Sequence, residues 1–244
     1  MLFSVNLRAL ICALYAAALV MTALPSSASA SQKLLFVSAA HSNKAKVSLV
    51  KELASRYQMT IDQMAEKELS LEQASRVFGN YDLVILDGVS VRESKTTYAK
   101  YEPVVVAMSQ TTKTRFLPIN WLEATHLTLG LEPDHALRLH EYYGNGGVEN
   151  LTRMLAYLRY RVLAPDMSKN IEPPIIFPQL GLYHPDYPSL TFESLEEYLR
   201  WRGQGERQKG SKVVGVLLQR SLIESAQTQV IDSAIAEIEA SGAL

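Results

Sequence analysis

The chain has 244 residues, of which 24 are Lys or Arg and 25 are Asp or Glu, so its formal net charge at pH 7 is -1. This balance argues against a nucleic-acid-binding protein held by bulk charge, and no basic run changes that conclusion. With 48% hydrophobic and 20% charged residues, the composition is that of a globular protein, not of a collagenous or disordered one. Cys12 is the only cysteine, which excludes an intrachain disulfide, a CxxC redox pair and a cysteine-based zinc site.

The first 30 residues have the pattern of a secretory signal peptide. Arg8 is the only charged side chain before Lys33, residues 9–24 are almost wholly apolar, and a run of small residues ends at Ala30. The alternative is a retained membrane anchor, but this apolar stretch of 16 residues is shorter than the roughly 20 that span a bilayer. We therefore expect cleavage after Ala30, a periplasmic or secreted protein of bacterial type, and no stable membrane span after cleavage.

Strand-like and helical patterns alternate over residues 31–119. Apolar runs predict strands, and apolar spacing predicts the helices between them, with Pro103 near the first turn of the third helix. The expected strands cover residues 34–37, 59–64, 81–86 and 115–119, and the expected helices cover residues 44–57, 70–79 and the surroundings of 101–108. This alternation predicts right-handed βαβ crossovers and an open, mostly parallel sheet of Rossmann or flavodoxin-like type. Ligands in such sheets bind at the carboxyl ends of the strands, here residues 38–43 and 87–90.

The remainder of the chain divides into helices, a linker and a second α/β segment. We expect helices over residues 133–143, ended by Gly144, and 148–162. Residues 164–190 are rich in proline and form a linker between an N-terminal α/β domain, residues 31–163, and the start of a second, truncated α/β domain, residues 191–244.

The second α/β segment has its own expected elements. Thr191 caps a helix that runs to residue 201, residues 213–218 form a strand, and a capping box at Ser221 and Glu224 opens a helix that ends at Gly242. A βα unit normally returns to its sheet with another strand, and none follows here. We therefore expect the chain to be the front end of a longer polypeptide.

Several common site motifs are absent from the sequence. It contains no GxGxxG, Walker A or GxSxG motif. His135 and His140 are five residues apart, which turns them about 140° from each other on a helix and argues against a zinc pair. His41 follows the first strand and is a candidate ligand or base, with a solvated loop histidine as the alternative. The sequence predicts no catalytic residue and no metal ligand.

Residues 182–186 read Leu-Tyr-His-Pro-Asp and form the most unusual loop of the chain. They place an aromatic ring, an imidazole and a carboxylate close together, where a loop between domains can reach a cleft. Tyr183, His184 and Asp186 are therefore candidate substrate-binding residues. The alternative is a linker pinned in place by Tyr183 and Pro185. Gly146 and Gly147 leave a similar choice between an anion-binding turn and a simple entry into the next helix.

Four motifs in order resemble a known family. Residues 146–151 read GGVENL, residues 181–186 GLYHPD, residues 192–201 FESLEEYLRW and residues 214–221 VGVLLQRS. Their order resembles the large subunits of the cobaltochelatase (CobN) and magnesium chelatase family, with its "GGxxNLxxLLxYL" helix, "YHPD" loop, "YLxW" helix and "VGVLxxRS" turn. The resemblance covers about residues 140–244, whereas residues 31–130 match only in architecture.

The resemblance implies a role in inserting a metal into a tetrapyrrole (cobalamin, porphyrin or haem) or removing it. It implies an N-terminal fragment of a much longer protein, without cofactor and without family catalytic residues, and inactive alone. The tetrapyrrole and Co²⁺ or Mg²⁺ would be ligands of the full-length relative. Its partners would be chelatase subunits or a metal or tetrapyrrole uptake system. The export signal departs from the family, whose ATP-driven partners work in the cytoplasm. The alternatives are a stand-alone periplasmic tetrapyrrole- or metal-binding module without catalytic activity and, more weakly, a generic sugar- or ion-binding α/β domain.

Overall fold

The computed structural model describes residues 31–40, 42–88, 91–111, 113–120, 127–203 and 212–243. The expected signal peptide lies outside these residues, as do the candidate His41 and part of the loop after residue 87. Within the described segments, no helix is both long and apolar enough to cross a membrane.

A four-stranded parallel sheet forms the centre of residues 32–163. Its strands are β1 (Gln32–Ser38), β2 (Met59–Ala65), β3 (Leu83–Asp87) and β4 (Arg115–Ile119). They lie in the order β2-β1-β3-β4, and the register pairs Leu34 of β1 with Ile61 of β2 and with Leu83 of β3. The expected open, parallel α/β sheet is confirmed. The strand order changes direction between β1 and β3.

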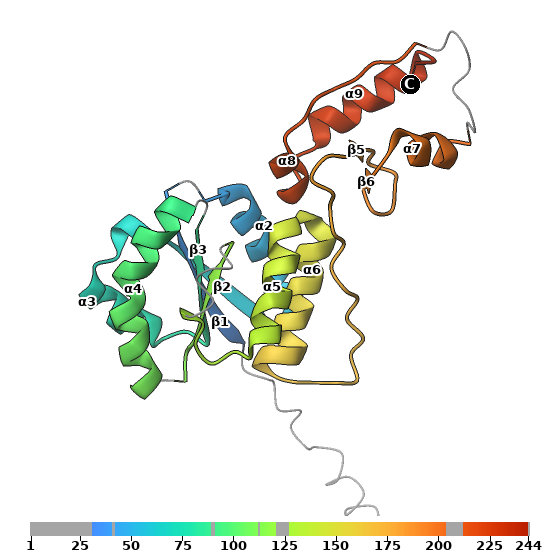
Figure 1. Cartoon of the computed structure of the whole chain (residues 1–244). Helices are drawn as coiled ribbons and strands as arrows, with labels where there is room; N and C mark the ends of the chain where they lie inside the picture. The colour runs from blue at the N-terminus through green and yellow to red at the C-terminus, as the bar shows by residue number, and fades with distance from the viewer. Residues whose placement is uncertain are drawn as a thin grey trace, which may run out of the picture. The chain divides into compact units, whose positions relative to one another are not determined.

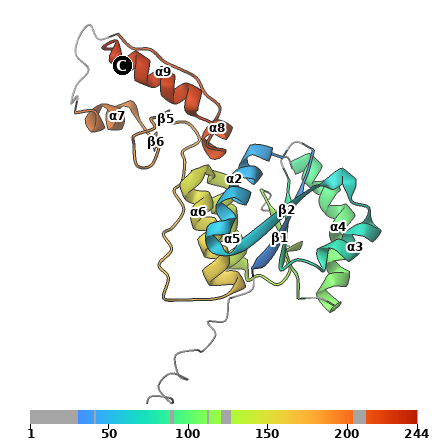
Figure 2. The ribbon, with the colours of Figure 1, turned by 180° about the vertical axis from the view of Figure 1, so that it is seen from behind.

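Helices cover both faces of this sheet, as Figures 1 and 2 show from opposite sides. One face carries α2 (Lys44–Ala54), α5 (Pro133–Asn145) and α6 (Gly147–Tyr157), and the other carries α3 (Leu71–Phe78) and α4 (Val91–Thr111). Two 3₁₀ turns, Ser55–Tyr57 and Glu66–Glu68, follow α2 and β2, and a π-helical turn, Leu158–Leu163, follows α6.

The two-sided cover explains the continuous apolar runs of the strands. In β1, Leu34 and Phe36 point into the core beneath α2, α5 and α6, whereas Leu35 and Val37 point into the core beneath α3 and α4. A strand buried on both faces needs apolar residues at every position and not at alternate ones.

Two helix details differ from expectation. Pro103 lies inside α4, which begins at Val91, and not in its first turn. Neighbouring Tyr101 and Val104 are buried in the core, and this packing outweighs the hydrogen bond that proline cannot donate. Gly144 does not end α5, which continues to Asn145. The C-cap is Gly146, which has a positive φ of 64°, and there an added Cβ would clash with the carbonyl oxygen of Glu224, so glycine is required.

The segment after residue 163 is irregular until residue 181 and then forms small elements. These are the antiparallel pair β5 (Leu182–Tyr183) and β6 (Thr191–Phe192), followed by α7 (Leu195–Trp201), α8 (Arg220–Glu224) and α9 (Gln229–Ala240). Figure 1 shows them in orange and red. Thr191 is therefore a strand residue, and Ser194 caps α7 by accepting a hydrogen bond from the Glu197 amide. The domain boundaries expected at residues 163 and 190 stay predictions.

The expected strand over residues 213–218 does not form, because no described strand lies beside it to share backbone hydrogen bonds. The segment is extended and exposed, with Leu217 at 99% exposure.

The helix expected to open at Ser221 instead begins at Arg220, with Gln219 as its N-cap, and ends at Glu224. Ala226, which has φ 55°, lies between α8 and α9. The Glu224 carboxylate binds Lys46 and Arg220 and does not reach back to complete a capping box.

Candidate functional site

The loop that carries the candidate residues is held by its own backbone. The His184 amide donates to the Leu190 carbonyl at 3.0 Å, and the Leu190 amide donates to the Tyr187 carbonyl at 2.8 Å. Gly181 precedes the loop at a point where an added Cβ would lie 2.7 Å from the Phe192 carbonyl oxygen. Glycine therefore lets the chain approach β6 closely enough for this turn to form.

His184 is almost fully buried, at 2% exposure. Its Nδ1 accepts a hydrogen bond from the Asp186 amide at 3.1 Å, and its Nε2 lies 3.2 Å from Oε1 of Glu239. Because the Nδ1 lone pair faces an N–H donor, the proton sits on Nε2, which donates to Glu239. The imidazole thus uses both of its nitrogens inside the fold.

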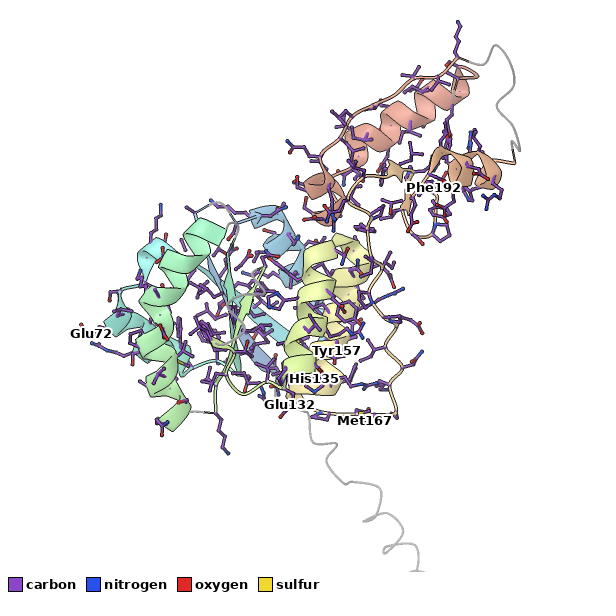
Figure 3. All side chains as sticks on the ribbon, viewed as in Figure 1. Glu72, Glu132, His135, Tyr157, Met167 and Phe192 are labelled. Atoms are coloured by element: carbon purple, nitrogen blue, oxygen red, sulfur yellow. The ribbon has the colours of Figure 1, made fainter. Side chains whose placement is uncertain are left out.

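An aromatic cluster packs around this imidazole. The His184 ring lies 4.8 Å from Trp201, and Tyr187 stacks on Phe192 at 3.8 Å. Phe192, labelled in Figure 3, also contacts Trp201 at 5.4 Å and Tyr198 in an edge-on arrangement. These rings supply the apolar core of the β5–β6 and α7 segment.

Tyr183 anchors the same loop to α9. Its hydroxyl donates to Oδ1 of Asp232 at 2.7 Å, and Thr228 donates to the other carboxylate oxygen at 3.0 Å. Burial and then the bond to Asp232 raise the pKa of Tyr183 to about 12, against an opposing contribution from Thr228. Asp232 and Glu239 are seven residues apart on α9, which places them on one face, two turns from each other. Tyr183 and His184 therefore bind the loop to this helix at two points.

The three candidate residues are thus near one another but have different surroundings. Tyr183 and His184 lie at the wall of a cavity, whereas Asp186 is exposed and meets His184 through its backbone amide. The carboxylate that does meet the imidazole belongs to Glu239, 55 residues away in the sequence, and no local sequence pattern marks that pairing. Binding of a substrate by the three residues stays a prediction.

The cavity has a volume of about 390 Å³, within the usual range for small-molecule sites. Its walls come from residues 177–184, α7, the extended segment 213–218, α8 and α9. Most lining side chains are branched aliphatic residues, including Leu182, Leu195, Leu199, Val214, Val216, Leu217, Ile223, Ile231, Ile235 and Ile238. Polar groups at the wall include Glu239 and Arg220. The arrangement suits a largely apolar ligand that has a few polar substituents.

A second group of polar side chains lies where β3 ends. Asp87 is fully buried, and it accepts hydrogen bonds from the Tyr143 hydroxyl at 2.9 Å and from Nδ2 of Asn120 at 2.8 Å. Burial raises the pKa of the Asp87 carboxyl to about 6, although the bond from Tyr143 and the Lys46 ammonium oppose this shift. The Ser42 hydroxyl donates to the Asp87 backbone carbonyl at 2.7 Å. This is the strand edge where the sequence predicted a ligand site, and both Asp87 carboxylate oxygens are already hydrogen-bonded.

Lys46 joins this group to α8. The residue is 3% exposed, and its ammonium donates to the Tyr143 carbonyl at 3.0 Å and to Oε2 of Glu224 at 3.1 Å. It also lies 4.7 Å from the centre of the Tyr143 ring. Burial of a lysine needs such partners, since an unpaired buried charge is strongly destabilising.

The two helical histidines are in separate places, as expected from their spacing. His135 lies beside Tyr157, with its Nδ1 2.8 Å from the phenolic oxygen (Figure 3). His140 is buried beside β4, and burial lowers its pKa to about 4, against an opposing hydrogen bond with the Pro118 backbone. Among the described residues, no group of three or more His, Cys, Asp or Glu side chains is arranged to hold a metal ion.

Gly146 and Gly147 form the turn between α5 and α6, and anion binding by this turn stays a prediction. Gly146 caps α5 and precedes α6, and Glu149 in the first turn of α6 pairs with Arg153 at 2.9 Å.

The cavity-forming part of the chain is similar to a known protein family. Residues 140–244 match the family described as CobN/Magnesium Chelatase. The expected resemblance is confirmed over the range in which the four motifs lie, and that range includes every residue that lines the cavity.

A solved structure gives a weaker comparison with a member of this family. The catalytic subunit of cobaltochelatase from Mycobacterium tuberculosis is 17% identical, with a TM-score of 0.47. The comparison covers 87% of this chain and 15% of that subunit, so the chain spans a small part of its length. No curated protein matches the chain.

Proposed function

We propose that this chain takes part in inserting a metal into a tetrapyrrole or removing it, and that the cavity of its CobN-type segment contacts the macrocycle. The observation that carries the proposal is the coincidence of the family match with the cavity: residues 140–244 contain all of the walls. A tetrapyrrole has a broad apolar face and polar substituents at its rim, which corresponds to aliphatic walls with Glu239 and Arg220 among them.

In this proposal Tyr183 and His184 have different tasks. Tyr183 can offer its ring to the macrocycle while its hydroxyl stays bound to Asp232. His184 uses both ring nitrogens within the fold, so axial ligation of a metal requires it to leave Glu239. Its task in the folded state is therefore to shape the wall of the cavity, together with Trp201.

The experiment is a titration of haem and, separately, of a cobalt corrinoid into residues 31–244, followed by the visible absorption of the ligand. Saturable binding with one tetrapyrrole per chain is expected. His184→Ala is a secondary probe, because it removes a buried side chain and must be accompanied by a thermal unfolding curve. If neither tetrapyrrole binds saturably while the chain remains folded, the cavity has another occupant and the proposal is wrong. One such occupant is a polypeptide strand beside residues 213–218.

We also propose that the chain is exported, on the strength of the apolar segment between Arg8 and the small residues ending at Ala30. Cells that express the whole chain with its first 30 residues should release a protein whose N-terminus is Ser31. Mass spectrometry of the periplasmic fraction measures this directly. Full-length protein retained in the cytoplasm or membrane fraction would contradict export.

A further inference from the structure

The short helix α8 lines the cavity and also contacts α2. Ile223, which is 6% exposed, and Arg220 line the cavity, whereas Glu224 reaches the buried ammonium of Lys46 on α2. The same end of α8 lies against Gly146, where the backbone approach is so close that no side chain fits. The position of one cavity wall therefore depends on contacts made outside the cavity.

Lys46 is the central group of those outside contacts. Its side chain is 4% exposed, and its ammonium is held between the Tyr143 carbonyl, the face of the Tyr143 ring and the Glu224 carboxylate. Oε1 of Glu224 in turn lies 3.0 Å from Nε of Arg220, and Arg220 also donates to Oδ1 of Asn145 at 3.2 Å. That Asn145 oxygen also accepts from the Phe177 amide, at the start of the cavity-lining segment.

We propose that Lys46 is a positioning residue: its ammonium holds α8 through Glu224 and so fixes the wall that α8 gives to the cavity. This inference rests on the proposed function only where ligand binding is measured. The buried Lys46 ammonium that loses Glu224 is left without a carboxylate, and Glu224 that loses Lys46 keeps only Arg220 of its own helix, so either loss frees α8 from α2. The wall is then no longer preorganised for a ligand.

The test combines Lys46→Met, Glu224→Gln and the double variant. Lys100→Met is the matched control, since Lys100 also pairs with a glutamate, Glu66, at 2.7 Å and lies 5.2 Å from a tyrosine ring, but belongs to α4 on the opposite face of the sheet. Amide hydrogen exchange reports the position of α8 without any ligand. Haem titration reports the cavity.

In Lys46→Met and in Glu224→Gln, amides of residues 222–226 should exchange at least about fivefold faster, while β1 and β3 keep their protection. Haem affinity should fall by a similar factor, and the double variant should lose no more than the single ones. Lys100→Met should leave the α8 amides and haem affinity unchanged.

Unchanged protection of α8 in both single variants would overturn the inference, as would equal loss of protection in β1. If Lys46→Met does not fold, Glu224→Gln tests the same contact from the α8 side. If the wild-type chain binds neither haem nor the cobalt corrinoid, the proposed function fails, but the exchange measurement still decides the role of Lys46.

Discussion

Asp87 and His140 are two buried titratable side chains whose pKa values shift in opposite senses. Burial raises the pKa of Asp87 to about 6, so the folded state favours its protonated form. Its contribution to stability is present below its ordinary pKa and is lost as the pH rises through about 6. Burial lowers the pKa of His140 to about 4, so its contribution is present above its ordinary value of 6.5 and is lost as the pH falls toward 4.

Between pH 4 and 6 the two contributions therefore oppose each other, and each corresponds to about 3 kcal/mol over its full range. Relative to the wild type, the free energy of unfolding of Asp87→Asn should rise with pH over this interval, and that of His140→Gln should fall. The asparagine keeps an acceptor for Asn120 and can donate to the Tyr143 oxygen. Urea unfolding at pH 4, 5, 6 and 7 measures both slopes. Two variants that follow the wild-type curve would show that neither group is linked to folding.

At the scale of elements, the sequence predicts the helices and strands that are marked by a local motif or by a continuous apolar run. The apolar runs of β1 and β3 mark strands covered on both faces, and Ser70 with Gln73 forms the expected capping box. Residues 213–218 carry an equally apolar pattern, yet a strand exists only when a neighbour accepts its hydrogen bonds. The apolar pattern of a segment does not show whether such a neighbouring strand is present.

The same limit applies to the candidate site. The unusual loop drew attention to Tyr183 and His184, and both do lie at the cavity wall. Their partners Asp232 and Glu239 come from α9, about 50 residues further along the chain, so only folding shows that they meet. Lys46 and Glu224 are 178 residues apart and were missed for the same reason.

Residues 213–218 should be the least protected extended segment of the chain. Their backbone amides donate to no described backbone carbonyl, and Val213, Val214 and Leu217 are at least half exposed. In hydrogen-exchange mass spectrometry these amides, and more weakly those of α9, should exchange before those of residues 33–119. Protection of residues 213–218 equal to that of β1 would show that the segment is paired. An exposed, unpaired apolar segment is also an aggregation hazard, so the measurement should be made at low protein concentration.

At the scale of the whole molecule, the tightly packed sheet differs from the cavity-forming segment that follows it. The parallel sheet has a closed apolar core on both faces, whereas the segment from residue 177 onward forms a cavity of about 390 Å³ whose aliphatic walls include the exposed Leu217. A contiguous aliphatic surface of this kind is rare on soluble proteins and is unfavourable when water covers it. We infer that an apolar occupant covers these walls, and under the proposed function that occupant is a tetrapyrrole.

The most direct test of tetrapyrrole binding in the cavity compares two substitutions of exposed residues, Leu217→Asp and Val230→Asp. Leu217 is 99% exposed and lines the cavity, whereas Val230 is 81% exposed on α9 and is not among the lining residues. Leu217→Asp should weaken haem binding about tenfold or more, because burying a leucine against a ligand contributes about 1.5–3 kcal/mol and 1.4 kcal/mol is a factor of ten. Val230→Asp should bind as the wild type does, and both variants should unfold at the wild-type temperature. Equal affinity of all three proteins would place the tetrapyrrole elsewhere and contradict the account.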